Sequence, residues 1–177
     1  MNIRPLEKKD LPHIYRQKNS RSVMALWFEE PYNSFDELSL LYDRHVLDQT
    51  ERRFVIEKNG DFAGVVELME INTIHRHAEI QIIIDSKFQG HGLAQAGMQA
   101  GIEYGFNVLN LHKIYLYVDV DNAAAVHIYQ KIGFQTEGCL KQHFYAEGEY
   151  HDSYMMGLFA KDFRKSVKVP VKADEKA

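Results

Sequence analysis

Two glycines flank a histidine at the point where an apolar stretch gives way to a helical pattern. The run is Gln89-Gly90-His91-Gly92-Leu93-Ala94. Glycines let backbone N–H groups approach a ligand closely, and a helix N-terminus carries partial positive charge, so this spacing suits a phosphate group. A plain strand-to-helix turn is the alternative. The run is not a Walker loop, because no Lys-Ser/Thr follows, and it lacks the third glycine of a dinucleotide fingerprint.

A second group of residues is spread along one predicted helix and its exit. The pattern is Asn122-x-x-Ala125-x-x-x-Tyr129-x-x-x-Gly133-Phe134. It places an N-capping asparagine at the helix start, a tyrosine two turns later and a glycine suited to the C-terminal cap. Five specified positions in this order are hard to obtain by chance.

The segment from Trp27 to Glu51 is acidic, with seven carboxylates against Arg44 alone. Such a stretch suits a cationic ligand, and a solvated helix face is the common alternative. His75-x-His77 lacks a third metal ligand at a diagnostic spacing, so we interpret it as a hairpin end. Cys139 has no convincing His/Asn partner and is interpreted as a packing residue.

The glycine loop and the Asn-to-Tyr helix together resemble the Gcn5-related N-acetyltransferase (GNAT) superfamily, over about Ile3 to Phe159. The resemblance implies an α/β (α+β) fold with a central mixed twisted sheet flanked by helices. It also implies a bulged central strand and acetyl-CoA in a cleft between strands. We expect a single acetyltransferase domain over residues 1–160 and a flexible tail at 161–177.

Four further runs are similar to the bacterial spermidine/spermine N-acetyltransferases: Trp27 to Leu38, Glu51 to Val55, Val66 to Ile71 and Asn110 to Tyr115. This similarity implies spermidine and spermine as partners and an allosteric polyamine site between the subunits of a dodecamer. By motif, that site would contain Met24, Glu29, Glu37, His45, Val46, Leu47 and Asp48. Glu29 and Glu70 would hold a divalent cation, Mg²⁺ or Ca²⁺, when polyamine is absent. Asn33 stands where close relatives would carry an acid, which puts the polyamine affinity in question.

The resemblance also assigns the cosubstrate and the acceptor amine to particular residues. Strand residues Glu79, Ile80 and Gln81 would border the polyamine. Residues that would contact acetyl-CoA are Ile82, Ile83, Ile84, Gln89, Gly90, His91, Gly92, Leu93, Ala94, Gln95, Asn122, Ala125, Tyr129 and Lys131. No catalytic metal is implied.

The expected reaction is direct attack of a polyamine amine on acetyl-CoA in a ternary complex. Tyr129 would be the general acid for the departing thiolate, and Glu70 or Glu79 would accept the amine proton. Two other functions stay open: an N-terminal acetyltransferase of ribosomal proteins, and a non-catalytic sensor of polyamine or CoA.

Composition narrows the possible functions and locations of the protein further. The chain has 177 residues, one cysteine and a net charge of −4, which argues against a nucleic-acid partner. The longest apolar runs, such as Ile82 to Ile84, are strand-sized, so we expect no membrane segment. With no disulfide framework and no signal-peptide pattern, we expect a cytoplasmic protein.

The elements that must position these residues follow from periodicity and turn chemistry. Asn59-Gly60 predicts a tight hairpin between strands at 53–58 and 62–71. Ser34 to Glu37 is a capping box that predicts a helix from Phe35 to about Asp48–Glu51. A long helix is expected over 92–109 with Leu93, Ala96, Ala100 and Tyr104 or Phe106 facing inward. The other expected elements are strands at 2–6, 78–85, 114–118, 134–140 and 150–159, and helices starting at Asp10 and Asn122.

Overall fold

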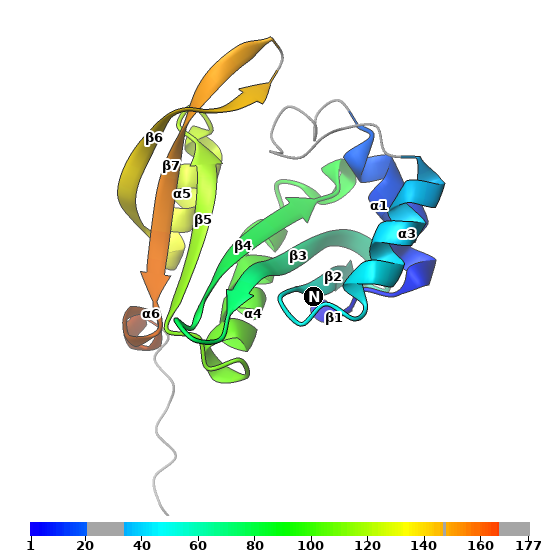
Figure 1. Ribbon diagram of the computed structural model, residues 1–177, viewed down its shortest axis with the longest axis horizontal. Helices are drawn as coiled ribbons and strands as arrows, with labels where there is room; N and C mark the ends of the chain where they lie inside the picture. Colours follow the sequence, from blue (N-terminus) through cyan, green and yellow to red (C-terminus); the bar gives the residue numbers. More distant parts are fainter. Residues whose placement is uncertain (21–33, 147, 167–177) are drawn as a thin grey trace, which may run out of the picture.

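A mixed sheet of seven strands, in the order β1-β2-β3-β4-β5-β7-β6, forms the centre of the molecule (Figure 1). The computed structural model describes residues 1–20, 34–146 and 148–166. The strands are β1 (Asn2–Pro5), β2 (Arg52–Lys58), β3 (Asp61–Asn72), β4 (His77–Ile84), β5 (Lys113–Asp119), β6 (Gln135–Ala146) and β7 (Glu149–Phe159). The helices are α1 (Leu11–Lys18), α3 (Phe35–His45), α4 (Leu93–Asn107), α5 (Ala123–Ile132) and α6 (Ala160–Ser166), with short 3₁₀ turns η1 (Lys8–Asp10) and η2 (Ser86–Phe88). The expected mixed sheet flanked by helices is confirmed.

Strands β4 and β5 part from each other in the middle of the sheet. Among the described strands they alone pair in parallel, and their register covers only His77–Glu79 against Lys113–Tyr115. Beyond these residues the two strands diverge, so the sheet opens into a V (Figure 1). The divergence lies where the family resemblance predicts a cleft between strands.

Helix α4 lies on one face of the sheet and makes its contact through glycines. A Cβ on Gly101 would lie 2.8 Å from Val66 Cγ2, and one on Gly105 would lie 2.8 Å from Ile114 Cδ1. The prediction of Ala96 and Ala100 as inward residues was therefore wrong, since both are half-buried and the glycines face the sheet. Absence of side chains at these positions brings the helix axis close to β2–β5.

Helices α1 and α3 cover the opposite face over β2 and β3. Their core residues Leu11, Ile14 and Leu38 pack against Val55, Phe62 and Val65. The Asn59-Gly60 turn between β2 and β3 has positive φ at both residues, 56° and 88°, as the predicted hairpin requires. Asp10 does not cap α1 with its side chain. Its carboxylate binds the Arg4 guanidinium instead, with N···O distances of 2.7 and 2.9 Å.

Three boundaries differ from the sequence expectation by more than two residues. Helix α3 ends at His45, earlier than the predicted Asp48–Glu51. Strand β6 continues to Ala146, because it pairs with β7 along most of its length. Residues 160–166 form α6 where a tail was predicted, and Phe163 anchors this helix by packing 5.6 Å from the ring of Phe106. Residues 167–177 lie outside the described part. No helix among the described residues is long and apolar enough to cross a membrane.

Candidate active site

The glycine loop before α4 has a backbone that only glycine adopts easily. Gly90 and Gly92 have φ of 77° and 73°, and an added Cβ at either would meet nothing within 4 Å. Conformation, and not crowding, therefore requires glycine here. Gly92 is the N-cap of α4, and the first N–H groups of a helix have no partners within the helix. The loop thus presents donors and a positive helix end to an anion.

The loop is tied to the end of β4 by side-chain hydrogen bonds. Gln89 Nε2 donates to the carbonyl oxygen of Ile84 at 3.3 Å, and His91 Nδ1 lies 2.8 Å from the carbonyl oxygen of Gln89. Leu93 is buried in the core, so only its backbone can serve a ligand, whereas Ala94 and Gln95 are half-buried in the first turn of α4.

Strand β4 offers backbone groups along the open side of the V. Ile82, Ile83 and Ile84 pair with β3 on one side, and the described register places no β5 residue opposite them. Their N–H and C=O groups on that side can bond an extended amide chain, in the manner of an added strand. Side chains of Ile82 and Ile83 pack to opposite faces of the sheet, so the backbone is what they contribute to the cleft.

Tyr129 lies on helix α5, which follows β5 in the chain and is capped at both ends. Asn122 Oδ1 accepts the N–H of Ala125 at 3.1 Å, and Gly133, with φ of 117°, ends the helix. Tyr129 packs against Phe134 with ring centroids 6.1 Å apart. Burial raises the pKa of Tyr129 to about 12, so its hydroxyl is protonated at neutral pH. Lys131 is exposed in the last turn of the helix.

A bulge in β3 brings a carboxylate into the base of the V. The β3–β4 register shifts by one residue between Met69 and Asn72, and Glu70 has a positive φ of 50°. The extra residue changes the alternation of side chains. As a result, Glu70 Oε2 accepts a hydrogen bond from Tyr115 Oη at 2.7 Å.

Glu79 lies next to this pair, because its Cα is in register with that of Tyr115 across the parallel strands. It is 8% exposed, and Gln81 Nε2 donates to its Oε1 at 2.7 Å. Burial is the largest cause of the raised pKa of Tyr115, and the hydrogen bond to Glu70 is the second. Tyr115 therefore stays protonated and acts as a hydrogen-bond donor. Burial and the charges of Glu79 and Glu70 also raise the pKa of Tyr117.

The predicted substrate residues of β4 divide between two faces. Glu79 and Gln81 share the face with Tyr115, whereas Ile80 is fully buried and its Cδ1 would lie 3.2 Å from a Cβ on Gly101 of α4. The side chain of Ile80 is therefore part of the core. Only its backbone is left to border a ligand in the cleft.

The predicted polyamine residues lie on and after α3, away from the V. Ser34 and Glu37 form the capping box, with Ser34 N to Glu37 Oε2 at 2.6 Å and Glu37 N to Ser34 Oγ at 3.1 Å. The bond from the Ser34 backbone lowers the pKa of Glu37, which stays an exposed anion. Met24, Glu29 and Asn33 lie outside the described residues, so the predicted Glu29–Glu70 cation pair stays a prediction.

A cavity of about 730 Å³ opens between α1, α3 and the sheet. Its charged end includes His45, whose Nδ1 lies 3.4 Å from Glu51 Oε2. Burial and the Arg53 guanidinium lower the pKa of His45, against the opposite effect of Glu51 and Asp48. The other lining residues predicted from the sequence are Val46 and Leu47, both largely exposed at the rim, and Asp48.

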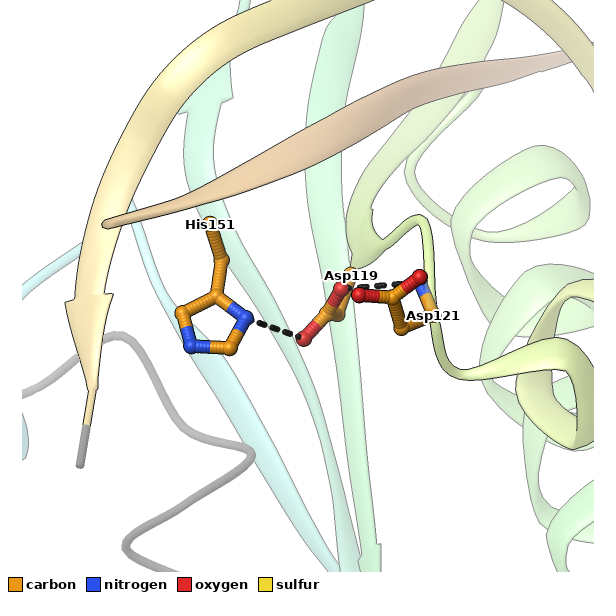
Figure 2. A group of neighbouring side chains, drawn as sticks. All are labelled: Asp119, Asp121 and His151. Carbon is orange, nitrogen blue, oxygen red and sulfur yellow. Dashed lines mark hydrogen bonds and ion pairs between the residues drawn. The ribbon is translucent and has the colours of Figure 1, made fainter. Parts of the chain in front are cut away.

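Sequence reasoning missed two groups of charged residues near these sites. Arg53 bridges Glu51 at 2.9 Å and Glu67 at 3.5 Å across β2 and β3, on the wall of the cavity. Asp119 and His151 lie together at the far end of β5 (Figure 2). Strand register brings each group together, so spacing along the sequence carried no signal for either.

A sheet that splays between β4 and β5, a glycine loop at the start of α4 and the Asn122-to-Gly133 helix together define the class of protein. The chain matches the acetyltransferase (GNAT) domain family over residues 1–135 and belongs to that family.

Two kinds of relative sharpen the comparison. The chain is 49% identical to spermidine N(1)-acetyltransferase of Escherichia coli strain K12, over 96% of this chain and 91% of that protein. The crystal structure of spermidine N-acetyltransferase from Vibrio cholerae in complex with CoA and spermine has a TM-score of 0.89 and 47% identity, over 92% of this chain and 96% of that one. A second Vibrio cholerae structure, of a spermidine/spermine N-acetyltransferase with manganese ions, has a TM-score of 0.84 and 45% identity, over 94% and 96% of the two chains.

Proposed function

We propose that the chain transfers an acetyl group from acetyl-CoA to a primary amine of spermidine or spermine. The observation that carries this proposal is the presence of two carboxylates beside Tyr115 at the base of the V, buried Glu79 and exposed Glu70, because a polycationic acceptor needs anions there. The 49% identity to a spermidine N(1)-acetyltransferase over nearly the whole chain supports the same substrate class. Acetyl-CoA, when bound along β4 and the glycine loop, supplies the acetyl thioester.

The first task of the site is to take a proton from the acceptor. An alkyl ammonium with a pKa of about 10.4 is neutral only about once in 2,500 molecules at pH 7, which costs about 4.6 kcal/mol. Glu79 is placed to accept that proton directly or through water, and Gln81 holds its carboxylate in position. Glu70, which accepts a hydrogen bond from Tyr115, would stabilise a positively charged ammonium group of the polyamine near the reacting amine.

The second task is to protonate the departing thiolate. A CoA thiolate resembles that of cysteine, with a pKa of about 8.5. Tyr129, with a pKa of about 12, would give up its proton uphill by roughly 5 kcal/mol if transfer preceded bond cleavage. We therefore infer that the proton moves in concert with C–S cleavage, as charge develops on sulfur.

We also propose that polyamine regulates the enzyme by binding beside α3. Glu37, His45 and Asp48 contribute charge there, together with Glu29 and Met24 outside the described residues. A divalent cation between Glu29 and Glu70, assembly as a dodecamer and a cytoplasmic location belong to the same proposal. Light scattering tests the assembly, since a monomer would contradict a site shared between subunits.

The decisive experiment measures thiol release from acetyl-CoA with spermidine, spermine, putrescine and a basic N-terminal peptide. We expect turnover with spermidine and spermine, with a sigmoidal dependence on their concentration. Turnover with the peptide alone would identify a protein acetyltransferase. No turnover with any acceptor would identify a sensor and overturn the proposed activity.

A further inference from the structure

A row of aromatic rings leads away from the base of the V on the face that carries Glu79. The ring of His77 lies 5.7 Å from that of Tyr115, and Tyr115 lies 5.9 Å from Tyr117. Tyr117 in turn lies 5.3 Å from His143 of β6. The row therefore crosses from β4 to β6 over the part of the sheet beyond the splay.

The row leads to a group of charged side chains at the end of β5. Asp119 Oδ2 lies 3.3 Å from His151 Nδ1, and Asp119 Oδ1 accepts the N–H of Asp121 at 2.9 Å (Figure 2). Ligand atoms of the three side chains all lie within 4.8 Å of one another. The side chain of Asp119 is 12% exposed, so it is partly desolvated yet reachable. Each carboxylate oxygen has two acceptor sites, so Asp119 retains capacity for another donor.

The distance along β5 matches the length of a triamine. Tyr115, in register with Glu79, and Asp119 are four residues apart, which is about 13 Å at the rise of a strand. The terminal nitrogens of extended spermidine are about 11 Å apart at the spacing of single bonds, whereas those of putrescine are about 6 Å apart. A triamine with one amine at Glu79 can thus reach Asp119, and a short diamine cannot.

We propose that Asp119, oriented by His151, binds the distal ammonium of the polyamine acceptor while the reacting amine lies at Glu79. The chain between them lies along Tyr117, because aromatic faces accept both methylene groups and ammonium charge. This inference rests on the proposed function. It adds the residue that makes the enzyme select acceptors by their length. A divalent cation is the competing occupant of the same side chains.

The test is a thermodynamic cycle that combines one change in the protein, Asp119→Asn, with one change in the acceptor, the loss of a terminal amine. Wild type and Asp119→Asn are assayed with spermidine and with two analogues, each of which replaces one terminal amino group by hydrogen, in buffer containing EDTA. Asparagine keeps the oxygen that accepts the Asp121 N–H. We expect removal of the distal amine to lower kcat/KM of the wild type at least tenfold, and that of Asp119→Asn less than twofold.

Two further variants separate binding from folding. Asp152→Asn removes the same charge from the neighbouring position of β7, where Asp152 pairs with Lys141 at 2.7 Å, and should keep the wild-type preference for spermidine. His151→Gln should weaken that preference, so that kcat/KM falls more for spermidine than for the analogue. If Asp119→Asn lowers turnover of spermidine and analogue equally, or keeps the full preference, the proposal is wrong.

A metal arm completes the experiment. Wild type and both variants are treated with chelator and titrated with Mn²⁺. We expect no tight Mn²⁺ site in the wild type that is lost in Asp119→Asn and His151→Gln. Such a site, together with an unchanged preference for spermidine, would make the cluster a metal site and overturn the proposal. Failure of the wild type to acetylate spermidine or either analogue would overturn the proposed function itself, which distinguishes the two failures.

Discussion

In the proposed mechanism, Tyr129 combines a half-buried ring with a hydroxyl that acts as an acid. Its packing against Phe134 and the core of α5 raises its pKa, which makes it a weaker acid than an ordinary tyrosine. The proposed role therefore depends on the position of the hydroxyl more than on its acidity.

Replacement of Tyr129 by phenylalanine should preserve the packing and remove the proton. We expect kcat with spermidine to fall by about 10² or more, because general acid catalysis contributes roughly that factor. Acetyl-CoA affinity, measured by calorimetry, should stay within about twofold by the same reasoning. Near-normal kcat in the variant would remove Tyr129 from the mechanism.

The raised pKa of Tyr129 also predicts the alkaline side of the pH profile. A pKa of about 12 leaves the phenol protonated throughout the accessible range. The kcat of the wild type, followed from pH 7 to about pH 10, should therefore show no fall caused by loss of this proton. An alkaline limb that is present in wild type and absent from Tyr129→Phe would contradict the assignment.

Helix α3 has two tasks at its N-terminus, since Glu37 closes the capping box and also belongs to the proposed polyamine site. The two tasks can be separated. Glutamine at the third helical position can still bond the Ser34 N–H, so Glu37→Gln keeps the cap and loses the charge. Ser34→Ala removes the other half of the box and keeps the charge.

We expect opposite effects from these two substitutions. Ser34→Ala should destabilise the protein by about 1 kcal/mol in denaturant unfolding. Its sigmoidal response to spermidine should persist. Glu37→Gln should unfold like wild type and respond to spermidine without the sigmoidal phase. Loss of the sigmoidal phase in both variants would show that Glu37 acts through the helix alone, and persistence in both would remove Glu37 from the response to polyamine.

Elements with local signals were predictable from the sequence, and elements set by register were not. Asn59-Gly60, the Ser34 capping box and the Asn122 and Gly133 caps each occupy a conformation that those residue types favour, so the hairpin and two helices were predicted correctly. Glu70 enters the cleft because of a one-residue bulge, and the Arg53–Glu67 pair depends on which strands are neighbours. Local spacing carries no signal for either contact. Ala96 and Ala100 were wrongly assigned to the face of α4 that packs on the sheet, which is formed by Gly97, Gly101 and Gly105.

At the scale of the whole molecule, a partly buried ion pair joins strand β1 to the 3₁₀ turn η1 that precedes the first helix. Burial alone would raise the pKa of Asp10, but the Arg4 guanidinium and the Glu7 N–H outweigh it and leave the pKa below its ordinary value. The side chain of Asp10 is 5% exposed, against 23% for Arg4. Because the folded pKa is the lower one, this stabilisation is present above about pH 4 and is lost as the pH falls through the folded value.

Asp10→Asn should therefore destabilise the protein at neutral pH by about 1–3 kcal/mol, and by less at acid pH. Thermal unfolding between pH 7 and pH 3 measures the difference. The exposed Lys8–Asp43 pair, with an N···O distance of 2.9 Å, supplies the control. Asp43→Asn should change the Tm little at any pH, and a constant difference between Asp10→Asn and wild type across the range would contradict the expected linkage.

The divergence of β4 from β5 leaves an edge strand in the interior of the sheet. From Ile80 to Ile84 the backbone on that side faces no strand among the described residues, and such edges template the pairing of other chains. Acetyl-CoA or CoA bound along β4, as proposed, would cover this edge and so protect the protein against self-association. Samples stripped of CoA should scatter more light on storage at 37 °C than samples kept with CoA. The lifetime of the enzyme in a cell would then depend on the concentration of its own acetyl donor.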